Sequence, residues 1–240
     1  MLSSAPLNAR LMLSATESLN KPLEKPFRDF LNAMIGDKRQ HARFLNMLSM
    51  LEHMGSRKIM LSQMNGILTQ DILKHLAEET RHAFFFKREA EKLSGIALEG
   101  YPDGHTMCAA SGRLYFGRLE AGLTTHLPPD AHRETGYLWV SLVVELRAIW
   151  IYRLYQQALA AANLVLSLKG VIAEEDRHLV DMVARLSEIG FNVVEFLPGA
   201  GLYEKERFEK LLSALQRGAP YPEPVNPTRS IAISAMPDSQ

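Results

Sequence analysis

The chain has 240 residues, 47% hydrophobic and 22% charged, so it can bury the core of one domain or at most two small ones. Its formal net charge is zero, which removes the overall positive field that draws proteins to nucleic acid or to anionic membranes. The single cysteine, Cys108, excludes an internal disulfide framework and a metal site built on paired cysteines.

Targeting and membrane signals are weak along the whole chain. Residues 1–21 alternate apolar and polar side chains and lack the apolar stretch of a secretory signal. No segment reaches about 18 consecutive apolar residues, the length at which a transmembrane helix is expected. The sequence therefore predicts a cytoplasmic protein with no membrane segment.

Leu, Met, Ala, Glu and Arg recur at helical spacing, whereas the alternating pattern of strands is nearly absent, so the chain is predicted to be all-α. In chain order, this periodicity and the Pro and Gly breakers predict five main helices. They cover residues 37–64, 69–93, 131–162, 164–189 and 202–216. A turn is expected at residues 65–66, and a further short helix near residues 105–119, within the long connection 95–130.

One short phrase occurs twice in the predicted helices. It reads A-E-E-T-R-H at residues 77–82 and A-E-E-D-R-H at residues 173–178. A Glu and a His three residues apart project from the same helix face, so Glu79 pairs with His82 and Glu175 with His178. A carboxylate beside an imidazole is half of a transition-metal site, and two such halves facing each other make most of a two-metal site.

Each helix that precedes one of these phrases carries a Glu inside an apolar run. These are Glu52 in L-S-M-L-E-H and Glu145 in L-V-V-E-L-R. An ionised carboxylate buried on such a face without a partner costs several kcal/mol, so a cation is expected beside it. In antiparallel hairpins with short turns, Glu52 returns to the level of Glu79 and Glu145 to that of Glu175.

The six residues together predict a metal centre. The predicted ligands are Glu52, Glu79, His82, Glu145, Glu175 and His178. Four carboxylates and two imidazoles suit two iron ions, with manganese or a mixed iron–manganese pair as alternatives and zinc possible in principle. His53 can replace Glu52 after a small helix rotation. His75, one turn before Glu79, is either an extra ligand or a neighbouring histidine.

Residues beside the predicted ligands are candidates to orient them. A metal-bound histidine usually donates its other ring N–H to a carboxylate, and Glu78, Glu174 and Asp176 are placed for this role. Arg81 and Arg177 can hold those carboxylates in place.

On these motifs, residues 37–189 resemble the ferritin-like di-iron carboxylate superfamily, whose pattern is E…E-x-x-H…E…E-x-x-H. The repeated acid-Glu-x-Arg-His phrase is similar to the oxygen-activating branch, such as bacterial multicomponent monooxygenases. The resemblance implies two helical hairpins with a long crossover, forming a ferritin-like four-helix bundle, and it implies the same six ligands. It also implies that a reduced di-iron pair reacts with O2 to oxidise a bound substrate.

The chain is accordingly divided into four parts. We expect an N-terminal extension (1–36), a ferritin-like bundle (37–190), a C-terminal helix (191–217) and an extended, Pro-rich tail (218–240). The last helix is expected either to pack on the bundle or to form a homodimer interface.

The predicted function is a non-haem di-iron oxygenase or oxidase that hydroxylates, N-oxygenates or desaturates a small organic substrate. Electrons must come from an external reductase or donor, because no flavin or nicotinamide fingerprint is present. Bulky residues predicted to line the substrate pocket are Phe84, Phe85, Phe86, Trp139, Trp150 and Met182. The rivals are a ferroxidase or peroxide scavenger without an organic substrate, and a helical bundle whose buried polar residues are only structural. An apolar cavity beside the metals distinguishes the first two.

Overall fold

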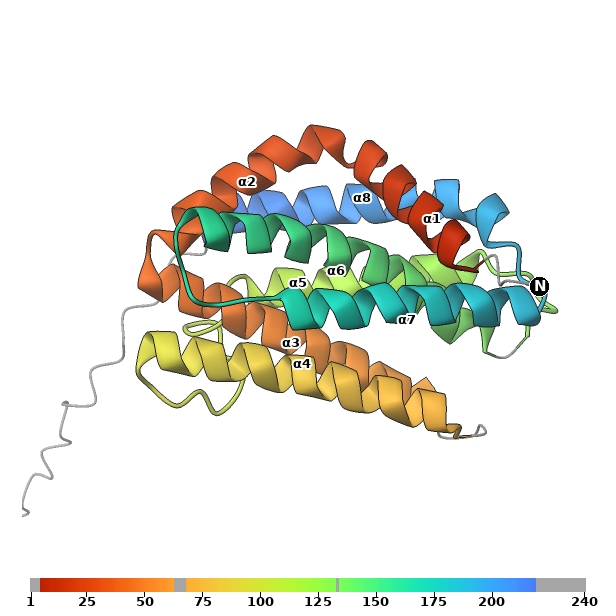
Figure 1. The fold of residues 1–240 in the computed structure, drawn as a ribbon, viewed down its shortest axis with the longest axis horizontal. Coiled ribbons are helices and arrows are strands. Elements are labelled where there is room, and N and C mark those ends of the chain that lie inside the picture. Colours follow the sequence, from red (N-terminus) through yellow and green to blue (C-terminus); the bar gives the residue numbers. More distant parts are fainter. Residues whose placement is uncertain (1–4, 63–67, 133, 219–240) are drawn as a thin grey trace, which may run out of the picture.

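Eight helices make up the part of the chain that the computed structural model describes, residues 5–62, 68–132 and 134–218, and no strand occurs there (Figure 1). The predicted all-α class is confirmed. The helices are α1 (Ala5–Leu19), α2 (Lys21–Ile35), α3 (Lys38–Ser62), α4 (Gln70–Ser94), α5 (Ala109–Thr125), α6 (Thr135–Ala161), α7 (Lys169–Glu188) and α8 (Val193–Arg217). The turn expected at residues 65–66 and nearly all of the tail expected at 218–240 lie outside the described residues.

The four helices that carry the predicted ligands are paired as two hairpins. Helix α3 packs along α4 and α6 along α7, while α3 also contacts α6 and α4 contacts α7 (Figure 1). The ends of α4 have local causes: the Thr69 side chain accepts a hydrogen bond from the backbone N–H of Ile72, and Gly95 closes the helix at φ 73°. The sequence predicted this C-terminal stop.

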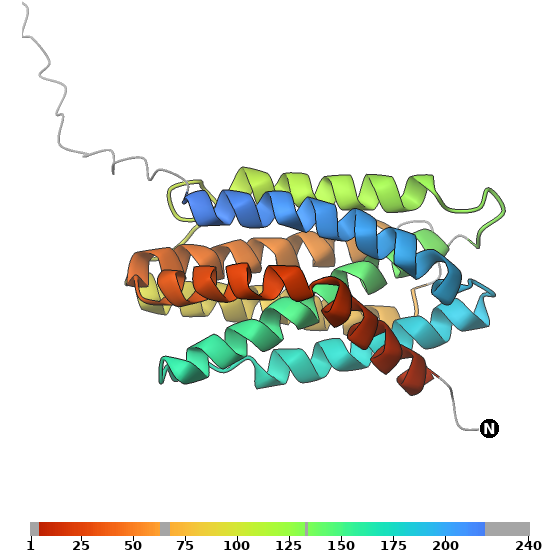
Figure 2. The same cartoon turned by 90° about the horizontal axis from the view of Figure 1, so that it is seen from above.

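Two helices occupy the N-terminal stretch, for which the sequence indicated no helix. Helices α1 and α2 lie across α6, and α1 also contacts α7, so that Phe27 and Leu31 are fully buried (Figure 2). Phe27 stacks on Trp150 of α6 and meets the edge of Phe208 of α8, which joins three helices in one aromatic cluster.

Helix α8 begins nine residues before the predicted start, because Pro198 and Gly199 do not interrupt it. The helix packs along α5, which is longer than the short helix expected in the crossover (Figure 2). A buried ion pair joins α8 to α6: the Arg147 guanidinium donates to both oxygens of the Glu204 carboxylate, at 2.8 and 2.5 Å. Asn20 and Tyr115 complete this network, so α8 packs on the helices that hold the site.

Among the described residues, no helix is long and apolar enough to span a membrane.

Candidate metal centre

The structure brings the six predicted ligands together in the middle of the helices, on four different elements. Each of the six side chains is between 1% and 7% exposed. Helix α3 supplies Glu52, α4 supplies Glu79 and His82, α6 supplies Glu145, and α7 supplies Glu175 and His178. The repeated phrases therefore face each other across the seam between α4 and α7.

Two groups of four residues can each hold a metal ion, because in each group the ligand atoms lie within 4.8 Å of one another. The first group is Glu52, Glu79, His82 and Glu175, and the second is His75, Glu79, Glu145 and His178. Glu79 belongs to both groups. Because one carboxylate can bridge two metals, this arrangement fits a pair of ions.

His75 is the residue that sequence reasoning left undecided, and the structure places it in the second group. Its Nε2 lies 3.4 Å from Glu79 Oε1 and 3.6 Å from Glu145 Oε1. The signal in the sequence was its position one turn before Glu79 on the same face. His53, the alternative to Glu52, is exposed on the other side of α3, with its ring against Tyr101.

Glu175 links the two groups through their histidines. Its Oε1 lies 3.0 Å from His82 Nδ1, and its Oε2 lies 2.9 Å from His178 Nδ1. Both imidazoles therefore turn the same ring nitrogen towards the centre of the site.

Three inward-facing atoms are buried without a hydrogen-bond partner: His75 Nε2, His82 Nδ1 and Glu79 Oε1. A buried polar atom without a partner costs roughly 1–3 kcal/mol, and such atoms are rare in native proteins. Nitrogen and carboxylate oxygen are ligand atoms for iron, manganese and zinc, so bound ions would satisfy all three atoms at once. The residues present thus fit a two-metal site.

The outward-facing nitrogen of each imidazole has a partner. His82 Nε2 lies 2.8 Å from the carboxylate of Glu174, and His178 Nε2 lies 2.9 Å from that of Glu78. His75 Nδ1 lies 2.8 Å from the Tyr137 hydroxyl. When that outer nitrogen carries the proton, the inner nitrogen presents its lone pair, which is the form a metal requires.

Each of these two histidines contacts a carboxylate from the opposite helix: His82 of α4 contacts Glu174 of α7, and His178 of α7 contacts Glu78 of α4. Arg81 donates to Glu174 at 2.6 Å, and Arg177 lies 3.7 Å from Glu78. The predicted roles of Glu78, Glu174 and the two arginines agree with these contacts. Asp176 instead accepts a hydrogen bond from Arg153, because it lies about 100° around the helix from Glu175.

Without cations, the site holds too much negative charge. Burial, together with the charges of Glu79 and Glu175, raises the pKa of Glu52 well above its ordinary value. Burial and the same two carboxylates raise the pKa of Glu145. The hydroxyl of Tyr152 donates a hydrogen bond to Glu52, which compensates only part of this cost.

The pKa values of two histidines are also raised, but here because the neighbouring carboxylates favour the charged imidazole. Burial alone would lower the pKa of His75, but the carboxylates of Glu145 and Glu79, 3.6 and 3.4 Å from Nε2, outweigh it and raise the pKa to about 12. For His82, burial is likewise outweighed by Glu175, and its pKa rises to about 10. These shifts favour the protonated imidazoles, so a metal ion that binds the same ring nitrogens must displace those protons.

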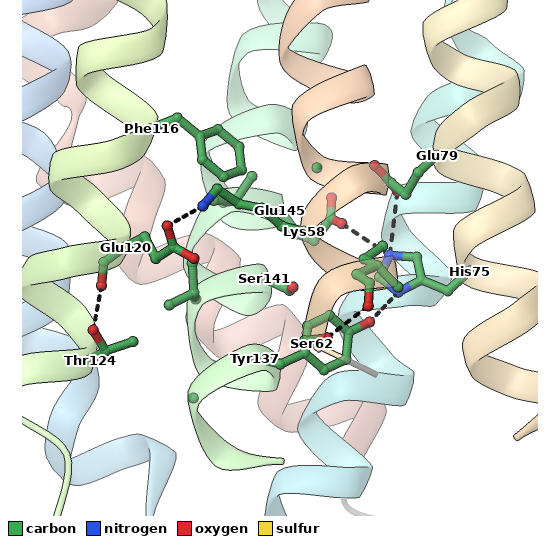
Figure 3. A pocket seen from close by; sticks show the side chains of 15 residues that line it. Lys58, Ser62, His75, Glu79, Phe116, Glu120, Thr124, Tyr137, Ser141 and Glu145 are labelled. Atoms are coloured by element: carbon green, nitrogen blue, oxygen red, sulfur yellow. Dashed lines mark hydrogen bonds and ion pairs between the residues drawn. The ribbon is translucent and has the colours of Figure 1, made fainter. Parts of the chain in front are cut away.

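Two cavities that share part of their lining adjoin the site. The first, of about 220 Å³, we call the outer channel: His75, Glu79 and Glu145 line its base, and the half-exposed Lys58 and Glu120 line its solvent side (Figure 3). The second, of about 70 Å³, we call the inner chamber, and its walls include Phe27, Phe44, Leu48, Leu51 and Phe208. Both cavities are lined by Gly55, Glu79, Phe116, Val144 and Glu145.

A third cavity, of about 440 Å³, follows the seam between α4 and α7 and reaches His75 and His178. Its lining includes five carboxylates, those of Asp71, Glu78, Glu134, Asp181 and Glu188. It gives the site a second, more polar approach.

The bulky residues predicted to line a substrate pocket mostly lie elsewhere. Phe84 is 62% exposed on the outer face of α4, and Trp150 packs between Phe27 and Phe208 in the core. Of the predicted set, Met182 alone lines one of the three cavities described above. The rotation of each helix about its own axis determines which side chains face the cavities, and sequence periodicity does not define that rotation to within a residue or two.

No protein-family model, curated protein or solved structure matches this chain. The case for a function therefore depends on the geometry of the site.

Proposed function

We propose that this chain is a non-haem di-iron oxygenase or oxidase that uses O2 to oxidise a small organic substrate by hydroxylation, N-oxygenation or desaturation. The proposal includes a ferritin-like bundle for α3, α4, α6 and α7. The observation that carries it is the pair of buried four-residue groups sharing Glu79, with three ligand atoms that have no hydrogen-bond partner. Manganese, alone or with iron, suits the same donors.

The residues of the chain have separate tasks in this proposal. Four carboxylates and three imidazoles bind the ions, and Glu174, Glu78 and Tyr137 orient the imidazoles from outside. Two bound iron ions would supply the electrons that activate O2. Two ferrous ions can give only two electrons, one each. An external donor must therefore return two electrons to the site after each turnover.

The cavities favour an organic substrate over iron storage or scavenging. The outer channel is walled by Ile59, Phe116, Val140 and Val144, and it ends directly at Glu79 and Glu145. The inner chamber adds aromatic and aliphatic walls beside the same two carboxylates. An apolar cavity next to the metals is what an oxygenase needs and a ferroxidase does not.

One observation favours a second candidate, a ferroxidase that oxidises iron itself. The third cavity leads to His178 past Asp71, Glu78 and Asp181, and carboxylates attract ferrous ions; Glu134 and Glu188 of the same lining are paired with Arg185. In that case iron would enter between α4 and α7, and the outer channel would have no organic occupant.

The test is anaerobic reconstitution with ferrous iron, followed by metal analysis and exposure to O2. The proposal expects two irons per chain and, with a chemical reductant, O2 consumption that depends on an added organic compound. A ferroxidase would consume O2 in proportion to added iron alone. A chain that binds fewer than one iron after reconstitution would rule out both candidates.

A further inference from the structure

Gly55 marks the point where the outer channel and the inner chamber meet, since it lines both cavities. It lies in the interior of α3, between Glu52 and Ile59 on the side that faces the site. A glycine there destabilises the helix by about 1 kcal/mol relative to alanine.

Packing does not explain this glycine. A Cβ added at residue 55 would meet only Glu79 Oε2, at 3.5 Å, which is an ordinary van der Waals distance. Alanine would therefore fit without a clash, whereas a larger side chain would extend into the cavity space that residue 55 lines. The absence of a side chain therefore leaves space at residue 55, on the wall that the two cavities share.

The outer channel has an opposite pair of charges at its solvent side. Lys58 reaches across the cavity from α3 to the Glu120 carboxylate on α5, and its ammonium group lies 5.8 Å from the centre of the Phe116 ring (Figure 3). The two side chains are 33% and 39% exposed. A guest that carries both charges side by side would give each member of this pair a new partner if it separated them.

These two features define one kind of guest. A carboxylate alone would leave Glu120 without a partner, and an amine alone would leave Lys58 without one. An α-amino acid head carries both charges side by side, and an apolar side chain suits the walls of the channel and the chamber. A volume of about 220 Å³ corresponds to roughly seven waters, enough for a head and several carbons.

We propose that the site binds an α-amino acid with a long apolar side chain, whose head is held between Lys58 and Glu120 and whose tail passes Gly55 into the inner chamber. Gly55 then determines how long a tail the site accepts. The tail crosses the face of the site formed by Glu79 and Glu145, which is where a bound substrate would be oxidised. This inference rests on the function proposed above and names its substrate class.

The test measures binding without turnover, on protein loaded with Co(II), by calorimetry and by the visible absorption of the cobalt. The guests are straight-chain α-amino acids from alanine through norvaline and norleucine to two longer homologues. In the unmodified protein, affinity should rise about fourfold for each added methylene until the chamber is full. In Gly55→Leu the rise should stop at the shorter homologues, and Gly55→Ala should lie between the two.

Gly117→Leu is the matched control, because it places the same side chain in the interior of helix α5 at an exposed position with no neighbour within 4 Å. It should behave like the unmodified protein. The inference about Gly55 is wrong if Gly55→Leu retains both cobalt ions and still binds the long homologues with unchanged affinity.

The charged head is tested separately with an alkanoic acid and an alkylamine of matched length. The amino acid should bind at least tenfold more tightly than either, and Lys58→Met or Glu120→Gln should remove that advantage. Equal binding of the acid or the amine overturns the assignment of the head. If two cobalt ions bind but no amino acid does, only this inference fails; if cobalt does not bind, the proposed function fails with it.

Discussion

Both four-residue groups share Glu79, so substitutions of the predicted ligands should affect metal binding unequally. Glu52 belongs to the first group only and Glu145 to the second only. Replacing either by Gln should therefore remove one metal ion, whereas Glu79→Gln should weaken both sites. Gln preserves the size of the side chain and removes its charge, so the cavity created is small.

The magnitude follows from linkage between binding and folding. A metal present at about 100 times its dissociation constant stabilises the folded chain by about 2.7 kcal/mol per site, or about 5 kcal/mol for two. For a chain of this size, 1 kcal/mol shifts the melting temperature by about 2–4 °C, so two metals should raise it by about 10–20 °C. Glu52→Gln and Glu145→Gln should each retain about half of that shift, and Glu79→Gln almost none.

The assay is scanning calorimetry with and without anaerobic Fe(II) or Mn(II), alongside metal analysis of the same samples. Melting temperatures without metal serve as the control, because they report the effect of each substitution on the fold alone. If Glu79→Gln bound as much metal as Glu52→Gln, the shared-ligand arrangement would be refuted.

Three further predictions concern residues outside the ligand set. Glu174→Ala should weaken the metal held by His82 by about 10–100-fold and spare the other, as separate phases of a metal titration would show. Glu204→Leu should lower the free energy of unfolding, measured in urea, by about 3–5 kcal/mol because it leaves the buried Arg147 unpaired. Adding Arg147→Met should recover most of this loss. If the losses of the two substitutions simply added, the ion pair would not explain them. Burial lowers the pKa of His41 to about 4, below the ordinary value of about 6.5. The neutral imidazole therefore stabilises the fold fully above pH 6.5, and this stabilisation is lost as the pH falls from 6.5 to 4. His41→Gln should therefore gain stability relative to the unmodified protein between pH 6.5 and 4, and equal pH slopes would contradict the assignment.

The sequence predicted the helices whose ends are encoded locally. Helix α4 begins after Thr69, whose side chain caps it, and ends at Gly95 in the left-handed conformation. Both residue types are recognisable cap signals in a sequence. The start of α8 was missed because Pro198 and Gly199 are breakers by rule, yet helix packing against α5 overrides them. The helices of residues 5–35 were missed because their apolar residues alternate with polar ones and are interrupted by Pro22 and Pro26. The surface that they cover comes from α3 and from α6, α7 and α8, and the last three lie far away in the sequence.

The site was predictable to the extent that it is a repeat. Two E-x-x-H phrases fixed which side chains share a face of each helix, and the structure brings them together with Glu52 and Glu145. What the sequence leaves open is the rotation of one helix against another. That rotation decides that His75 faces the centre, and it is also what creates the outer channel and the space at Gly55.

Charge balance distinguishes the metal centre from a second buried polar cluster, the one around Arg147. On α6, Glu145 and Arg147 lie two residues apart and point to different sides of the helix. Arg147 meets one carboxylate, that of Glu204, with two hydrogen bonds, so this cluster is neutral within the chain.

The cluster around Glu145 is not balanced. Four carboxylates face three imidazoles, so even full protonation of the histidines leaves one negative charge, and each proton gained there blocks a ring nitrogen. Outside this centre, Glu78 and Glu174 are already matched by Arg177 and Arg81. The remaining negative charge can be neutralised only by protons on the acids or by cations from solution. Bound divalent ions would supply that positive charge and at the same time bind His75 Nε2, His82 Nδ1 and Glu79 Oε1, the buried atoms of this centre that have no hydrogen-bond partner.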